Sequence, residues 1–177
     1  LFFVKYVLNL EDKTGLFLII YFLSAIITFP FWIKLSNKIS KSSTWILSIL
    51  VAISAFKFVP FLNEGDFLYF AIICVITGMC LGADMALPSS IQADVANQTK
   101  QKDEDLTGVL FGFWAMITKL SLSLAVAISF ITLEFTNFES SNINQTSIVA
   151  IIVLYSIVPI IFKLSSIFLL LKYKKTN

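Results

Sequence analysis

Two ionisable side chains lie deep inside long apolar segments, Asp84 in the segment at about 67–92 and Lys119 in the segment at about 107–133. A charge near the middle of a lipid bilayer costs about 2.5–3.5 kcal/mol on insertion scales, so such residues usually face protein or water. At about 1.5 Å per helical residue, Asp84 lies roughly 12 Å and Lys119 roughly 18 Å from the same membrane surface. We therefore predict that the two charges pair in one state of a transport cycle and exchange partners in another. A fixed structural ion pair is the alternative.

The residues around these charges extend the predicted pathway. Pro88 follows Asp84 by four positions and cannot donate a hydrogen bond to the Asp84 carbonyl, which leaves a carboxylate and a backbone oxygen available to a proton or an alkali cation. Around Lys119, small residues recur every three or four positions and share one helical face, which predicts a protein-facing stripe. Its members are Gly108, Gly112, Ala115, Lys119, Ser123 and Ala127. A similar stripe of Gly78, Gly82 and Ala86 is interpreted as helix packing.

The composition is that of an integral membrane protein of the helical type. Hydrophobic residues make up 58% of the 177, the mean hydropathy is +0.89 and only 14% are charged, against about 25% in soluble domains. All thirteen basic residues are lysines and there is no histidine. These absences argue against nucleic-acid binding, histidine-based metal sites and histidine-dependent catalysis. Cys74 and Cys80 are interpreted as packing residues, and no enzyme or cofactor is expected.

The apolar residues gather into blocks long enough to cross a bilayer, which needs about 20 residues. Five full spans are predicted at about 15–33, 43–62, 67–92, 107–133 and 147–171. Residues 1–9 are interpreted as the end of a further helix whose beginning lies outside the sequence. The fold class is therefore an all-α membrane protein, with one partial and five full transmembrane helices over 1–177. Six helices are the half-unit of many transporters.

The lysines also predict the orientation. Loops on one side carry eight of them and the opposite loops carry only Lys13. The positive-inside rule then places the C-terminus in the cytoplasm, at the plasma (inner) membrane. On the same side, Asp94 at a helix exit is predicted to pair with Lys34 or Lys38 as a cytoplasmic gate. Lys163, about eight residues from that surface, is interpreted as snorkelling to it, with a direct role as the alternative.

The run LGADMALPSSIQADVANQ, a short charged loop and TGVLFGFWAMITKLSLSLA together resemble the glycoside–pentoside–hexuronide:cation symporter family, the melibiose-carrier branch of the major facilitator superfamily. FPFWIKLSNKISKSSTW resembles a basic loop of that family, with Ser40 where glycine is usual. The resemblance maps the chain onto the C-terminal half, from the end of the seventh helix to the twelfth. By position, Lys119 matches the lysine associated with the sugar and cation site, Asp84 the acid of the G-A-D run, and Trp114 the tryptophan between them.

The resemblance implies symport of a sugar or related small solute by alternating access, coupled to H⁺ or Na⁺. The expected partners are the solute, the coupling cation, the lipid bilayer and an N-terminal six-helix half, which in the family holds the main cation-binding acids. Two alternatives stay open: a half-length membrane subunit with a structural or regulatory role, and a carrier of lipid-type solutes from the same family. A membrane-embedded enzyme is disfavoured because no loop offers a nucleophile–base set or a metal cluster.

Overall fold

A computed structural model describes residues 2–100, 106–139 and 143–176, and in these ranges all regular structure is helical. The elements in order are α1 (Phe2–Tyr6), η1 (Glu11–Lys13), α2 (Thr14–Ile39), α3 (Lys41–Phe56), η2 (Val59–Phe61), α4 (Phe67–Lys100), α5 (Thr107–Phe135) and α6 (Gln145–Thr176). Within these ranges five helices are long and apolar enough to cross a membrane. The predicted all-helical membrane fold is confirmed.

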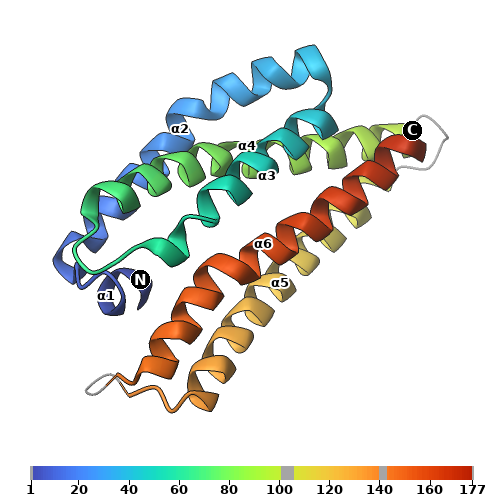
Figure 1. Ribbon diagram of the computed structural model, residues 1–177. Helices are drawn as coiled ribbons and strands as arrows, with labels where there is room; N and C mark the ends of the chain where they lie inside the picture. The colour runs from blue at the N-terminus through green and yellow to red at the C-terminus, as the bar shows by residue number, and fades with distance from the viewer. Residues whose placement is uncertain (1, 101–105, 140–142, 177) are drawn as a thin grey trace.

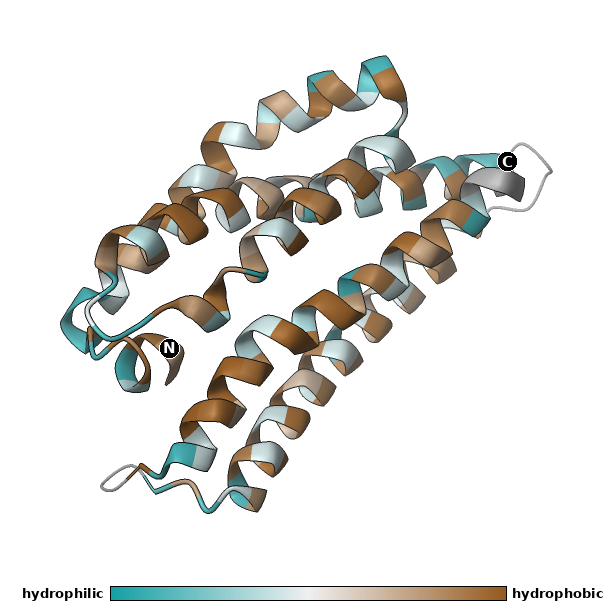
Figure 2. Cartoon of the chain, viewed as in Figure 1, coloured by the Kyte–Doolittle hydropathy of each residue, from teal (hydrophilic) through white to brown (hydrophobic). Residues whose placement is uncertain are grey.

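The distribution of hydropathy along the helices explains why they form in a bilayer. Apolar residues dominate the middle of each long helix, and polar residues gather toward the helix ends and connections (Figure 2). A helix satisfies all its own backbone hydrogen bonds, which is what a segment surrounded by hydrocarbon requires. The chain is thus a multi-pass membrane protein.

Helices α2 and α4 pack closely because α4 has glycines where they cross. A Cβ atom added to Gly78 would collide with the carbonyl oxygen of Tyr21, and one added to Gly82 would lie 2.8 Å from that of Ala25. The close approach lets Trp32 Nε1 donate a hydrogen bond of 2.7 Å to the carbonyl of Met79. The interpretation of Gly78 and Gly82 as packing residues is therefore confirmed.

An aromatic cluster packs α1 against other helices near the N-terminal ends of α2 and α4. Phe3 stacks on Phe70 of α4 and on Tyr155 of α6, with ring centroids 5.5 and 4.8 Å apart. Phe17 of α2 meets Phe70 edge-on at 4.8 Å. Phe3 and Phe70 are among the most deeply buried side chains, so this cluster is the main apolar core.

Several helices differ in length from the predicted spans. Helix α2 continues past 33 to Ile39 and is separated from α3 only by Ser40, which has φ +82°. A positive φ favours glycine, which explains why glycine is usual at this position in the family that the loop resembles. In this chain the Ser40 side chain accepts a hydrogen bond from the Ser43 N–H at the start of α3. Helix α4 runs on through Pro88 to Lys100, and residues 101–105 of the predicted charged loop lie outside the described ranges.

The span predicted at 43–62 is not one helix. Helix α3 ends at Phe56, and Val59–Phe61 form a separate 3₁₀ turn. Pro60 explains the break, since it cannot donate to the carbonyl of Phe56 and its ring crowds that oxygen.

Helix α6 packs against α3, where Ile49, Ile53 and Leu170 form a buried cluster, and α5 runs alongside α6 (Figure 1). In the most apolar 18-residue window of α5 only 6% of the residues are buried, against 50% in that of α4. Nothing lies within 4 Å of a Cβ built on Gly108 or Gly112. The prediction that the α5 stripe faces protein is therefore wrong for the described residues. Periodicity shows which residues share a face and leaves open what covers that face.

Candidate functional site

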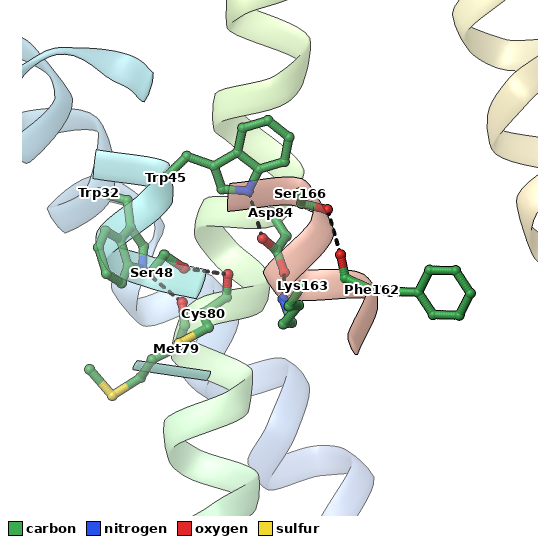
Figure 3. A network of polar contacts seen from close by, with 9 residues as sticks. All are labelled: Trp32, Trp45, Ser48, Met79, Cys80, Asp84, Phe162, Lys163 and Ser166. Carbon is green, nitrogen blue, oxygen red and sulfur yellow. Dashed lines mark hydrogen bonds and ion pairs between the residues drawn. The ribbon is translucent and has the colours of Figure 1, made fainter. Parts of the chain in front are cut away.

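Asp84 is the centre of a polar cluster within the membrane-spanning region. Its Oδ1 accepts a hydrogen bond of 2.9 Å from Trp45 Nε1, and its Oδ2 forms an ion pair of 2.8 Å with Lys163 Nζ. The three side chains come from α3, α4 and α6 and point toward one another (Figure 3). About a third of the Asp84 side chain and a fifth of the Lys163 side chain are exposed, 31% and 22% respectively. The charges are thus paired and partly shielded, as a bilayer interior demands.

The register between α3 and α4 places Trp45 beside Asp84. Ser48, one turn after Trp45, is fully buried and its Oγ donates a hydrogen bond of 3.3 Å to the carbonyl of Cys80, one turn before Asp84. Residues three or four apart lie on one helical face. Two matched polar contacts therefore stabilise the antiparallel pairing of these helices and place Trp45 within reach of Asp84.

The predicted pairing of Asp84 with Lys119 is wrong in this structure. Lys119 lies on the exposed surface of α5 and makes no hydrogen bond or ion pair with the described residues. Depth along a helix sets the height of a side chain in the membrane but not the direction in which it points. The interpretation of Lys163 as a snorkelling lysine is wrong for the same reason, because its ammonium group turns inward to Asp84.

The other predicted pathway residues do not gather around Asp84. Pro88 is buried within α4, which continues as a helix on both sides of it. Trp114 and Ser123 are exposed on α5, as Lys119 is. The structure therefore separates the predicted site into an Asp84 cluster on α3, α4 and α6 and a group of exposed residues on α5.

Asp94 forms an ion pair, but with a different lysine from those predicted. Its Oδ2 lies 2.6 Å from Nζ of Lys41, which also donates to the carbonyl of Ser90 at 3.4 Å. Lys34 and Lys38 sit on the exposed last turns of α2, because α2 is longer than predicted. Lys41 instead begins α3, the helix paired with α4. The sequence held the signal, since all three lysines stand in one basic segment.

Three neighbouring cavities follow the middle of α6. One of about 320 Å³ lies among α1, α2, α4 and α6, one of about 170 Å³ lies between α1, α5 and α6, and one of about 470 Å³ lies between α5 and α6. Leu154 lines all three, so they adjoin one another. Composition along the chain gave no sign of them, because each is made by residues from distant segments. We call the third one the α5–α6 recess.

The lining of the α5–α6 recess is almost wholly apolar. Its polar side chains are the hydroxyls of Ser121 and Ser129, and the remainder are Leu124, Ala125, Ile128, Leu154, Val158, Pro159 and Phe162. Ser121 is two residues from Lys119 on α5. Residues two apart on a helix point to nearly opposite sides, so Lys119 does not line the recess, whose walls are hydrocarbon-like.

Comparison with known proteins gives a family and a set of relatives. A family model described as MFS/sugar transport protein matches residues 1–177. The sodium-dependent lysophosphatidylcholine symporter 1 of Xenopus tropicalis is 24% identical over 176 residues, which is 97% of this chain and 33% of that protein. The symporter of the same name from Gallus gallus is 26% identical over 89% of this chain and 31% of its own length.

A third relative is the sphingosine-1-phosphate transporter MFSD2B of Xenopus tropicalis, 22% identical over 81% of this chain and 28% of its own length. No solved structure gives a significant match. The chain thus spans about a third of the length of the curated relatives it matches. These relatives do not support the melibiose-carrier branch or a sugar cargo. The family match over every residue, with five membrane-spanning helices, nevertheless settles the broader question: the chain belongs to the MFS/sugar transport protein family, a family of membrane transporters and not of enzymes.

Proposed function

We propose that this chain is part of a cation-coupled carrier for lipids that have one long apolar chain and a phosphate-bearing headgroup. The relatives are named for lysophosphatidylcholine and sphingosine-1-phosphate, and both of these compounds fit that description. This replaces the sugar expected from the resemblance with the lipid-type alternative. As in the sequence-based prediction, the carrier works by alternating access with its C-terminus in the cytoplasm.

The observation that carries the proposal is the apolar α5–α6 recess, and Lys119 on the other side of α5 adds a cation without a counter-ion among the described residues. Lys119 is an ammonium group within a membrane span that has no counter-ion among the described residues. Such a charge in hydrocarbon is costly unless an anion or water meets it. A lipid phosphate supplies the anion on the Lys119 side of α5, and the recess supplies apolar walls for a hydrocarbon chain on the α6 side. A sugar would need many hydrogen-bonding groups in place of those walls.

Asp84 has a structural role in this proposal. Both of its carboxylate oxygens already have partners, in Trp45 and Lys163. A cation that bound Asp84 would have to displace the Lys163 ammonium group. We therefore assign the pair to holding α6 against α3 and α4, and we take the coupling cation to be Na⁺ on the names of the relatives, bound elsewhere in the complete carrier.

Uptake by proteoliposomes tests this function. The chain is reconstituted with a complementary six-helix N-terminal half, and entry of radiolabelled lysophosphatidylcholine and melibiose is followed with and without an inward Na⁺ gradient. We expect gradient-dependent entry of the lysolipid and none of the sugar. Lys119→Ala should lower lysolipid uptake at least about tenfold, the effect of losing a charge-assisted hydrogen bond, and Lys119→Arg should retain most of it.

Either of two results would contradict the proposal. Gradient-driven sugar uptake without lysolipid uptake would restore the sugar reading. Equal lysolipid uptake by Lys119→Ala and the unmodified protein would remove Lys119 from the pathway.

A further inference from the structure

A groove separates α3 and α4 at the end where the two helices are joined by residues 57–66. Its volume is about 660 Å³, within the roughly 300–1,000 Å³ that is usual for ligand sites. The α3 wall includes Val51, Ser54 and Phe58, and the α4 wall includes Tyr69, Ile72 and Ile76. In each wall these residues follow the three- and four-residue spacing of one helical face.

The groove lies at one end of the helix pair because the polar contacts between α3 and α4 lie at the other. Those contacts are Lys41 with Asp94, Trp45 with Asp84, and Ser48 with Cys80. Beyond Ser48, toward the connecting turn, apolar side chains line a space between the two helices. The polar contacts hold the two helices together at one end, and the groove lies between the helices at the other end.

The walls of the groove belong to two membrane spans, Lys41–Phe61 and Phe67–Gln98. Phe58, Phe61 and Tyr69 are each more than 60% exposed. In a bilayer these exposed apolar side chains contact lipid and not water. A hydrocarbon chain is therefore the occupant that matches the walls.

The mouth of the groove is acidic and lacks a counter-ion. Asp66 lines it, and its Oδ2 accepts a hydrogen bond of 2.7 Å from the backbone N–H of Asn63. The neighbouring Glu64 accepts one of 2.7 Å from the Asn9 amide. Neither carboxylate has an ion pair with the described residues. An uncompensated carboxylate at a membrane surface favours an ammonium group.

Two lysines in a segment that touches this mouth already have carboxylate partners of their own. The segment that touches it, through a hydrogen bond from the Gly65 N–H to the Leu8 carbonyl, carries Lys5 and Lys13. Lys5 is paired with Glu11 at 2.7 Å and Lys13 with Asp12 at 3.3 Å. Lys57 caps α3 next to the lining residue Phe58 and is exposed. It does not line the groove, but it adds one positive charge next in sequence to Phe58, a residue of the α3 wall.

We propose that the α3–α4 groove is a binding site for a membrane phospholipid with an ammonium-bearing zwitterionic headgroup. An acyl chain lies between Phe58 and Ile72, the ammonium group binds the Asp66 carboxylate, and the phosphate lies toward Lys57. The site is separate from the α5–α6 recess and does not depend on the transported substrate. Its lipid is drawn from the leaflet on the side of the 63–66 turn.

Native mass spectrometry of the purified chain in detergent tests the site. The probes are phosphatidylethanolamine and phosphatidylglycerol with identical acyl chains, which differ in whether the headgroup carries an ammonium group. We expect the chain to retain phosphatidylethanolamine preferentially. Asp66→Asn should weaken that retention about tenfold, since it removes a charge-assisted hydrogen bond, and the asparagine side-chain oxygen can still accept from the Asn63 N–H. Ser54→Phe, which fills the groove, should reduce retention of both lipids.

Asp12→Asn is the matched control, because it removes a carboxylate from the same end of the molecule without touching the groove. Circular dichroism verifies that each variant keeps its helices. Equal retention of the two lipids by the unmodified chain would overturn the proposal. So would an equal loss in Asp66→Asn and Asp12→Asn, or unchanged retention in Ser54→Phe.

Discussion

At the scale of single residues, the structure shows which of the intramembrane charges are paired, and the pairs differ from those predicted. Asp84 and Lys163 form a pair that Trp45 completes, and Lys119 is left without a counter-ion among the described residues. A charge that has a partner inside a membrane contributes to the fold, whereas a charge that lacks one requires a ligand, water or another protein surface. The two residues that the sequence grouped therefore lie in different surroundings.

Breaking the Asp84–Lys163 pair should destabilise the fold, and reversing the two charges should restore part of the lost stability. Asp84→Asn leaves the Lys163 ammonium group without its anion, and we expect the free energy of unfolding to fall by about 1.5–3 kcal/mol. The double variant Asp84→Lys, Lys163→Asp should recover part of this, because it restores the ion pair but a lysine at position 84 cannot accept the hydrogen bond of Trp45. Unfolding in detergent, followed by circular dichroism, measures both changes.

Lys119→Ala is the control for that experiment. Because Lys119 makes no ion pair with the described residues, its removal should leave the unfolding free energy of the isolated chain nearly unchanged. If the charge-reversed double variant were as unstable as Asp84→Asn, the pair would not act through its charges alone and the structural assignment would need another basis.

At the scale of helices, a glycine is tightly packed in α4 and has open space beside it in α5. Gly78 contacts the backbone of α2, whereas Gly112 faces open space. An added methyl group must displace backbone at the first position and meets nothing at the second. This contrast gives a direct test of which stripe of small residues packs against protein.

We expect Gly78→Ala to lower the unfolding free energy by about 1–3 kcal/mol, the usual cost of overpacking. Gly112→Ala should raise it by up to about 1 kcal/mol, since alanine favours a helix over glycine. Thermal unfolding of the two purified variants provides the comparison. A destabilised Gly112→Ala chain would mean that another segment covers that face of α5.

At the scale of the whole molecule, α5 is the helix with the least cover. Its stripe with Lys119 and Ser123 is exposed along the side of the α5–α6 pair. The chain spans about a third of its curated relatives, and in our proposal a complementary half completes the carrier. That half must then shield a surface that is open in this chain by itself.

Thiol labelling tests this arrangement. The native Cys74 and Cys80 are buried and should react slowly with a maleimide in the folded chain. A cysteine introduced by Ser123→Cys should react quickly in the isolated chain and at least about tenfold more slowly after the complementary half is added. Ser165→Cys on the exposed surface of α6 is the comparison. Unchanged labelling at both positions would show that the α5 face stays open.

The sequence by itself predicted that this protein lies in a lipid bilayer, and it predicted five full spans where the described residues contain five helices long and apolar enough to cross one. Blocks of about 20 apolar residues form helices in a bilayer whatever their neighbours are, because backbone hydrogen bonds inside each helix satisfy that environment. The same local logic identified Gly78 and Gly82 as packing residues and the intramembrane charges as exceptional. It also identified the transporter superfamily through the motifs around Asp84.

Only the tertiary structure decided which charges meet. Asp84 could pair with Lys119 or Lys163 by depth alone, and Asp94 with Lys34, Lys38 or Lys41 by membrane side. The rotation of each helix and the order of its neighbours select Lys163 and Lys41. The rotation and the neighbours of a helix depend on contacts between segments such as α3 and α4, and the apolar pattern of one segment does not predict those contacts. The grooves beside α3 and α6 arise in the same way, because a cavity belongs to several helices at once.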